Sequence, residues 1–116
     1  MTITQIRLVT VPVTDQDRAK DFYTHVLGMI VRGDTTNGPM RWLEVAPDGS
    51  GTSLVLGAFP GAGSLQGLML HSEDIDADCA RLREAGVNVD GPHDRPWGRD
   101  ASFTDPDGNE LVLSTV

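Results

Sequence analysis

Few side chains in this sequence have the types and spacing that chemistry requires. The main candidates are Glu44, His71 and Glu110, because carboxylates and imidazoles can ligate a divalent cation or act as a general base. The other two histidines, His25 and His93, fall on a predicted helix surface and in a predicted loop, where solvation is the simpler interpretation. There is no GxGxxG after a strand, no Walker loop and no GxSxG elbow. Dinucleotide binding, phosphoryl transfer and hydrolysis therefore lack their usual motifs.

Two tryptophans need an explanation in a chain with only six aromatic residues. Trp42 falls in a predicted strand, and Trp97 falls in the predicted turn 95–99. A planar ligand could stack on either indole, and a cation over an indole face would be attracted further. The alternative interpretation is that Trp42 fills the sheet core and Trp97 closes a loop.

The 116 residues carry a formal net charge of −8. This charge repels nucleic acid and anionic membrane surfaces and favours a cationic or neutral ligand. No apolar run is long enough to span a membrane, and the first residues alternate like a strand instead of forming a signal peptide. We therefore expect a cytoplasmic protein that binds neither nucleic acid nor membranes. The single cysteine, Cys79, excludes an internal disulfide and a cysteine-cluster metal site.

Hydrophobic periodicity predicts the same order of elements in each half of the chain. The first half is predicted to contain a strand at 6–13, a helix from Thr14 or Asp15 to the stop residue Gly28, strands at 29–32, 40–46 and 53–59, and turns at 33–39 and 47–52. The second half is predicted to contain a strand at 67–72, a helix at 74–85 before the stop residue Gly86, and strands at 87–90, 100–104 and 110–115.

The two halves form an internal repeat. A shift of 58 residues pairs Gly28 with Gly86, and a shift of 59 pairs the Pro-Asp-Gly at 47–49 with that at 106–108. Each copy has the order βαβββ and is about 55 residues long, which indicates a duplicated supersecondary unit. The resulting prediction is one domain, residues 1–116, with module one at about 4–59, a linker at 60–66 and module two at about 67–116.

The predicted fold class is α+β, with two modules whose paired sheets curl into a cup and whose helices lie outside. A concave face between modules is a common place for a small-molecule pocket. Period-two alternation sorts the strand residues between the two faces. The predicted helix-facing set is Val9, Val11, Leu43, Val45, Leu54, Leu56, Leu111 and Leu113. The predicted cup-facing set is Leu8, Thr10, Trp42, Glu44, Val55, Gly57, Gly67, Met69, His71, Glu110, Val112 and Ser114.

Two stretches, VPVTDQDRAKDFYTHVLGM at 11–29 and PWGRDASFTDPDGNELVL at 96–113, resemble the opening and closing signatures of the vicinal oxygen chelate superfamily. That superfamily includes glyoxalase I, bleomycin resistance proteins and extradiol dioxygenases. The resemblance implies the paired βαβββ fold and either metal-dependent enzymes or metal-free drug-binding proteins. The PWGR segment is similar to that of the bleomycin resistance proteins, the metal-free branch.

The resemblance also implies four metal-ligand positions, one on the first and one on the last strand of each module. In this sequence they are Leu8, Val55, Gly67 and Val112, and none of these side chains can bind a metal. We therefore predict no metal and no cofactor. A relocated site built from Glu44, His71 and Glu110 is the alternative.

The sequence thus predicts a metal-free protein that binds a small organic molecule, possible ligands being an antibiotic or a pathway intermediate. The predicted site residues are Trp42 and Trp97 for stacking, Glu44 for a cationic or hydroxyl group, Arg99 for an anionic or carbonyl oxygen, and Met69 and His71 as further lining. One alternative is a lyase, isomerase or dioxygenase-like enzyme of the same fold, using a relocated metal or a general base. Another is an accessory module whose cup is filled by its own side chains or by a partner. A homodimer is expected from the family pattern and from the unprotected sheet edges.

Overall fold

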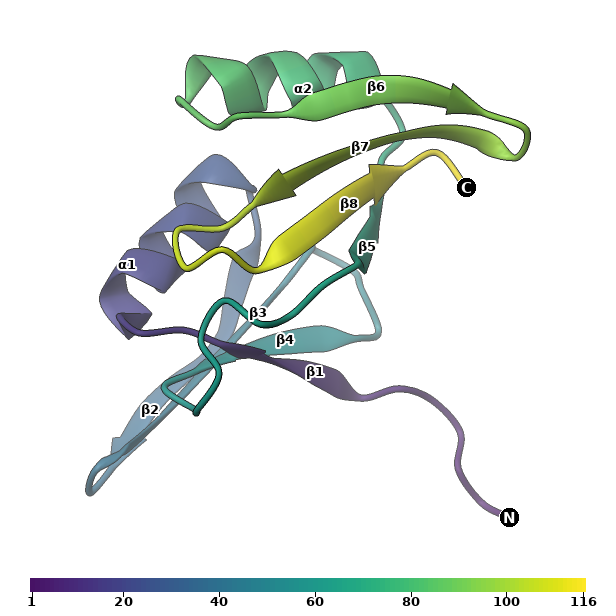
Figure 1. Ribbon diagram of the computed structural model, residues 1–116. Coiled ribbons are helices and arrows are strands. Elements are labelled where there is room, and N and C mark those ends of the chain that lie inside the picture. The colour runs from purple at the N-terminus through teal and green to yellow at the C-terminus, as the bar shows by residue number, and fades with distance from the viewer. The chain divides into compact units, whose positions relative to one another are not determined.

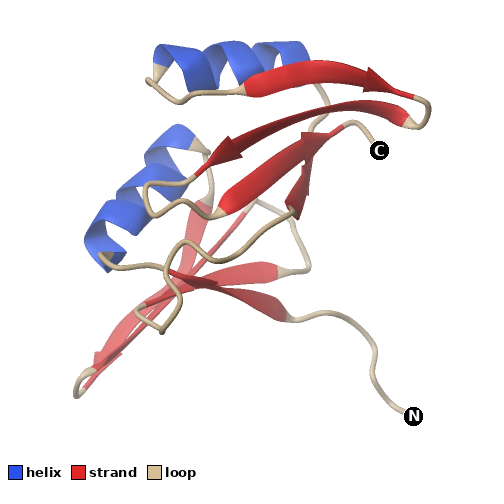
Figure 2. Cartoon of the chain, viewed as in Figure 1, coloured by secondary structure: helices blue, strands red, loops and turns tan.

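The computed structural model describes all residues 1–116 and divides into two compact units, Met1–Ala62 and Gly63–Val116. We call these units module one and module two. The boundary falls inside the predicted linker 60–66. Each module contains one four-stranded sheet and one helical segment, so the fold class is α+β (Figures 1 and 2).

Module one has the order βαβββ with an irregular helix. Its elements are β1 (Leu8–Pro12), α1 (Gln16–Asp21), the π-helical segment η1 (Phe22–Val26), β2 (Ile30–Asn37), β3 (Met40–Ala46) and β4 (Ser53–Gly57). In space the strands follow the order β1-β4-β3-β2, with β1 parallel to β4 and the other pairs antiparallel.

Module two repeats this topology. Its elements are β5 (Leu68–His71), α2 (Ile75–Glu84), β6 (Asp90–Arg95), β7 (Gly98–Thr104) and β8 (Glu110–Ser114). The strand order is β5-β8-β7-β6, and β5 runs parallel to β8. The predicted internal repeat is therefore confirmed at the level of strand order.

The helix boundaries follow from matching side chains in the two modules. The Asp15 carboxylate accepts a hydrogen bond from the Arg18 backbone N–H, and the Asp74 carboxylate accepts one from that of Ala77. Both contacts satisfy backbone donors that the first turn of a helix leaves unpaired. Gly28 and Gly86 adopt φ angles of 73° and 85°, a left-handed conformation suited to glycine. The predicted stops at these two residues are confirmed.

One face of each sheet packs against the helix of its own module. In module one α1 contacts β3 and β4, and in module two α2 contacts β6 and β7. The predicted helix-facing residues are buried, apart from the half-buried Val9. We call the other face of each sheet its open face. In register across it lie Thr10, Val55, Glu44 and Gly33 in module one, and Met69, Val112, Ser102 and Asp90 in module two.

The predicted boundaries of the edge strands β2 and β6 were wrong. The stretch 33–39 was predicted as a turn, but β2 continues to Asn37, because a bulge between Val31 and Gly33 restores its pairing with β3. The strand predicted at 87–90 begins at Asp90 and extends to Arg95. Its Pro92 is tolerated because β6 is an edge strand, where a missing N–H breaks no ladder bond.

Candidate functional site

The open face of module one carries a buried carboxylate with several partners. Glu44, on β3, is only 6% exposed. The Arg7 guanidinium donates from Nη1 to Oε2 at 2.9 Å and from Nη2 to Oε1 at 3.3 Å. The indole Nε1–H of Trp42 donates to Oε1 at 3.1 Å. We call Arg7, Trp42, Glu44 and Ser53 the Glu44 network, because the Ser53 hydroxyl is also hydrogen-bonded to this carboxylate.

These hydrogen bonds set the charge state of the network. The Arg7 guanidinium and then the Ser53 hydroxyl lower the pKa of Glu44 to about 2, against the opposing effect of burial. In turn, the hydrogen bond to the Glu44 carboxylate and its negative charge raise the pKa of Arg7. Glu44 is therefore ionised at neutral pH, and both of its oxygens already accept hydrogen bonds from within the protein.

Trp42 is held in place yet remains open to solvent. Its N–H is fixed by Glu44, and its Cδ1 would lie 3.7 Å from a Cβ built on Gly33, so the indole passes beside that glycine on β2. Nevertheless 45% of the residue is exposed. An indole with a fixed orientation and free surface is a suitable platform for stacking a planar ring.

Three other residues on or beside this face were not predicted from the sequence. Phe59 packs over Gly57, where an added Cβ would lie 2.0 Å from the ring Cε2. Arg32 donates from Nη1 to the Ser53 hydroxyl at 3.0 Å and from Nη2 to the backbone oxygen of Ser50. The third residue is Arg7, which lies 37 positions from Glu44 in the sequence. Gly57 was the only available signal, since a glycine in a strand often marks a close approach.

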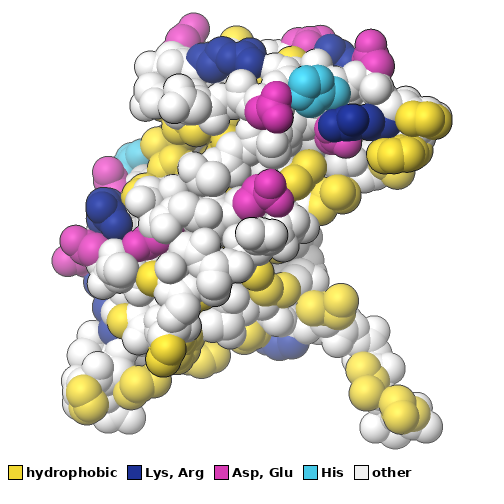
Figure 3. Space-filling view, in the orientation of Figure 1, with side chains coloured by type: hydrophobic (Ala, Val, Ile, Leu, Met, Phe, Trp, Pro, Cys, Tyr) yellow, Lys and Arg dark blue, Asp and Glu magenta, His cyan; other side chains and the backbone are white.

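The predicted residues of module two do not form one cluster. Met69 and His71 are both exposed on the open side of β5. Trp97 is 66% exposed at the tip of the β6–β7 hairpin, where Figure 3 shows hydrophobic side chains gathered. Arg99 lies on the helix-facing side of its sheet. It donates to Asp76 on α2 at 2.9 Å and to Asp94 on β6 at 3.1 Å.

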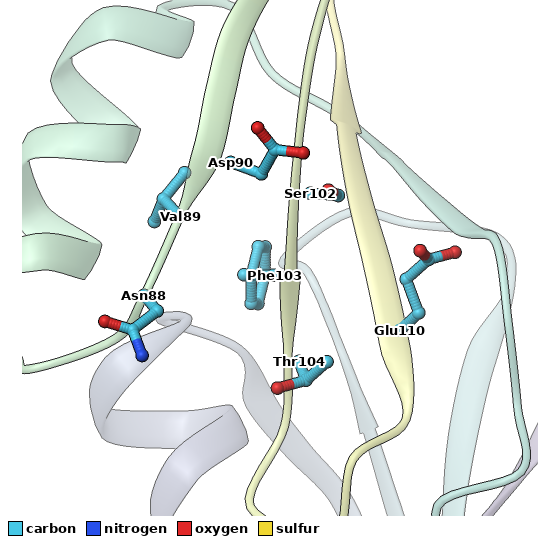
Figure 4. Close-up of a pocket in the computed structure, with 7 residues that line it drawn as sticks. All are labelled: Asn88, Val89, Asp90, Ser102, Phe103, Thr104 and Glu110. Carbon is cyan, nitrogen blue, oxygen red and sulfur yellow. The ribbon is translucent and has the colours of Figure 1, made fainter.

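Module two also has a shallow pocket of about 450 Å³ beside β6, β7 and β8 (Figure 4). Its lining residues are Asn88, Val89, Asp90, Ser102, Phe103, Thr104 and Glu110. Asp90 and Glu110 lie on either side of β7 in this view, so carboxylates border a lining that combines the hydroxyls of Ser102 and Thr104 with the ring of Phe103. Both carboxylates already have partners, because Asp90 lies 2.7 Å from His93 and Glu110 accepts from the Gly67 N–H at 2.9 Å.

The four positions at which the family resemblance implies metal ligands do not fit a divalent cation in this structure. Leu8 and Val55 lie on β1 and β4, Val112 lies on β8, and Gly67 directly precedes β5. Their side chains offer no donor atom. No group of three or more His, Cys, Asp or Glu side chains is arranged to hold a metal ion.

Comparison with known proteins agrees with this architecture. The model of the Glyoxalase/Bleomycin resistance protein/Dioxygenase superfamily matches residues 5–113. The chain belongs to this superfamily. The structure is also similar to that of TnmS3, described as an antibiotic binding protein from Streptomyces sp. CB03234, with 53% identity and a TM-score of 0.93. That match covers 98% of this chain and 97% of TnmS3.

Two further proteins are similar to this chain along nearly its whole length. A glyoxalase/bleomycin resistance protein from the same Streptomyces strain is also 53% identical, with a TM-score of 0.86 over 95% of this chain and 99% of its own. The uncharacterised protein YetH of Bacillus subtilis (strain 168) is 39% identical over 96% of this chain and 98% of its own. In the present chain, no helix is long and apolar enough to cross a membrane.

Proposed function

We propose that this protein is a metal-free binding protein that takes up a small organic ligand with a planar ring system, an antibiotic being the first class to test. The observation that carries the proposal is the exposed Trp42 indole, whose N–H is held by a buried carboxylate. A ring that is already oriented loses little conformational freedom when a ligand stacks on it, and this preorganisation favours affinity. The similarity to TnmS3, which is described as an antibiotic binding protein, supports the same ligand class.

Isothermal titration with a panel of planar antibiotics tests the proposal. For a compound that binds, Trp42→Ala is expected to weaken affinity by about tenfold to a hundredfold, the scale of losing one aromatic anchor. Trp97→Ala is the matched variant, because Trp97 is the other tryptophan and is more exposed. Equal affinity of Trp42→Ala and the wild type would refute the stacking role of Trp42. Loss with Trp97→Ala would instead add the hairpin tip to the site.

An enzymatic role for Glu44 as a general base has less support. A carboxylate whose pKa is about 2 and whose oxygens accept from Arg7 and Trp42 is a weak proton acceptor at neutral pH.

Metal analysis of the purified protein tests the metal-free part of the proposal. A stoichiometric transition metal that survives dialysis would contradict it.

The proposal includes a cytoplasmic homodimer. Both sheets have unpaired edge strands, β1 and β2 in module one and β5 and β6 in module two. Unpaired edges are usually covered or blocked in stable proteins, and a second copy is one way to cover them. Light scattering after size-exclusion chromatography measures the mass directly, and a monomer at micromolar concentration would argue against the dimer.

A further inference from the structure

We infer that the planar ligand carries an anionic or strongly polarised oxygen at its edge, and that Arg7 receives this oxygen beside Trp42. This inference rests on the proposed function, since it describes the ligand that the Trp42 platform would hold. It replaces the expectation that Glu44 binds a cationic group.

Glu44 has no spare capacity for a ligand cation. Both of its oxygens accept hydrogen bonds from Arg7, and one also accepts from Trp42. The residue is 6% exposed, so an ammonium group would have to displace Arg7 and lose its own water to reach the carboxylate. Such an exchange only replaces one cation by another, so it offers little net binding free energy.

Arg7, by contrast, combines a fixed position with an open surface. Its side chain is 60% exposed, although two of its nitrogens are bound to Glu44. A guanidinium has five N–H donors, so donors remain for a ligand. Its backbone is anchored as well, because the Arg7 carbonyl accepts from the Ser53 N–H at 3.1 Å and the neighbouring Ile6 carbonyl accepts from the Thr52 hydroxyl at 2.7 Å.

The net charge of module one opposes an anionic oxygen near Trp42 much less than that of module two would. Module one has five basic and six acidic side chains, a net charge of −1, whereas module two has four basic and eleven acidic ones, a net charge of −7. Among the acids of module one, Asp15 caps α1, and Asp17 and Asp34 pair with Arg41. Glu44 is the carboxylate hydrogen-bonded to Trp42, and its charge is already compensated by Arg7.

Three probes with one ring system test the sign of the ligand charge: 2-naphthoate, 2-naphthamide and 2-naphthylmethylammonium. The readout is the Trp42 indole N–H signal in ¹⁵N NMR spectra, assigned with Trp42→Phe. Because charge-assisted hydrogen bonds are stronger than neutral ones, naphthoate is expected to bind about tenfold more tightly than naphthamide. The ammonium compound is expected to bind most weakly.

Two substitutions and one control sharpen the test. Arg7→Gln is expected to reduce the affinity for naphthoate to that for naphthamide. Glu44→Gln, which can still accept from Trp42 but leaves Arg7 uncompensated, is expected to strengthen naphthoate binding several-fold. Arg81→Gln removes the same charge from an exposed position on α2 and is expected to change neither affinity.

The outcomes separate the inference from the proposed function. Tightest binding by the ammonium compound, or an unchanged preference for naphthoate in Arg7→Gln, would overturn the inference and leave the stacking role of Trp42 intact. An indole signal that none of the three probes shifts would count against the planar-ligand proposal itself, and against the inference with it.

Discussion

The two modules share their helix-facing side and differ on their open faces. On the helix-facing side, Arg41 of β3 donates to Asp17 of α1 at 2.6 Å and to Asp34 of β2 at 2.9 Å. Arg99, which is 58 residues further on, donates in the same way to Asp76 of α2 and Asp94 of β6. We call these two arrangements the arginine clamps. Their recurrence indicates a structural role that the duplication has retained.

The open faces have diverged at equivalent positions. Glu44 pairs with Val55 in module one, and Ser102 pairs with Val112 at the corresponding place in module two. Two residues earlier in the same strands stand Trp42 and Asp100. Module one therefore presents an indole fixed by a buried ion pair, whereas module two presents the exposed Met69 together with the Ser102 hydroxyl and the Asp90 carboxylate, in a more acidic unit. A duplicated framework has thus acquired two chemically different surfaces.

The largest expected effect lies in the cores, where the modules should behave alike. Leu43 and Leu111 are both fully buried in their respective sheets. Leu43→Ala and Leu111→Ala should each lower the free energy of unfolding by about 2–5 kcal/mol, the range for leucine truncation in a packed core. Urea denaturation monitored by circular dichroism measures both. A loss below about 1 kcal/mol in one variant alone would show that its module is loosely packed.

The next prediction compares the diverged positions directly. Glu44→Ala removes the partner of both Arg7 and Trp42 and should lower the free energy of unfolding by about 1–3 kcal/mol, the usual consequence of breaking a buried charged hydrogen-bond network. Ser102→Ala at the equivalent position should change it by less than about 0.5 kcal/mol. Equal costs in the two variants would contradict the view that only module one has a built polar network.

The stability of the protein at acid pH measures the contribution of the Glu44 ion pair separately. Because the pKa of Glu44 falls from 4.5 to about 2 on folding, its ion pair contributes stability that is present above pH 4.5 and is lost as the pH falls toward 2. The contribution at neutral pH is about 2 kcal/mol after allowance for solvent screening at the exposed Arg7. In Glu44→Gln this part of the acid destabilisation should disappear. Parallel stability curves for wild type and Glu44→Gln between pH 5 and pH 2 would refute the assignment.

The framework could be predicted from the sequence because it depends on local signals. Period-two alternation located most strands, and aspartate caps with glycine stops located both helices. The same alternation placed Trp42 and Glu44 on one face, two residues apart. Residues two positions apart on one strand lie on the same face whatever the tertiary contacts, which is why this pair could be predicted.

The partners of that pair depend on long-range contacts and were not predicted. Arg7 reaches Glu44 across β4, and nothing in the residues around position 7 signals this. Arg99 was assigned to a turn, but β7 begins at Gly98, so Arg99 shares the helix-facing side with Ala101 and Phe103. The start of β7 was predicted too late because its partner β6 is bulged and has no clear hydrophobic alternation, so the sequence gives no sign of the hairpin that the two strands form.

The smallest expected effect concerns the arginine clamps, where exposure separates the two copies. The side chains of Arg41 and Asp34 are each only 22% exposed, whereas those of their counterparts Arg99 and Asp94 are 39% and 90% exposed. The helix aspartates Asp17 and Asp76 are largely exposed in both copies. Solvent weakens ion pairs, so Arg41→Gln should lower the free energy of unfolding by about 1 kcal/mol and Arg99→Gln by clearly less. Raising the salt concentration should reduce the difference in unfolding free energy between each variant and the wild type, because salt screens the interactions of exposed charges most strongly. A larger cost for Arg99→Gln than for Arg41→Gln would show that module two depends on its clamp more than the exposures indicate. If Arg99→Gln instead weakened ligand binding without affecting stability, Arg99 would have the ligand-binding role predicted from the sequence, and the two clamps would have diverged as the open faces did.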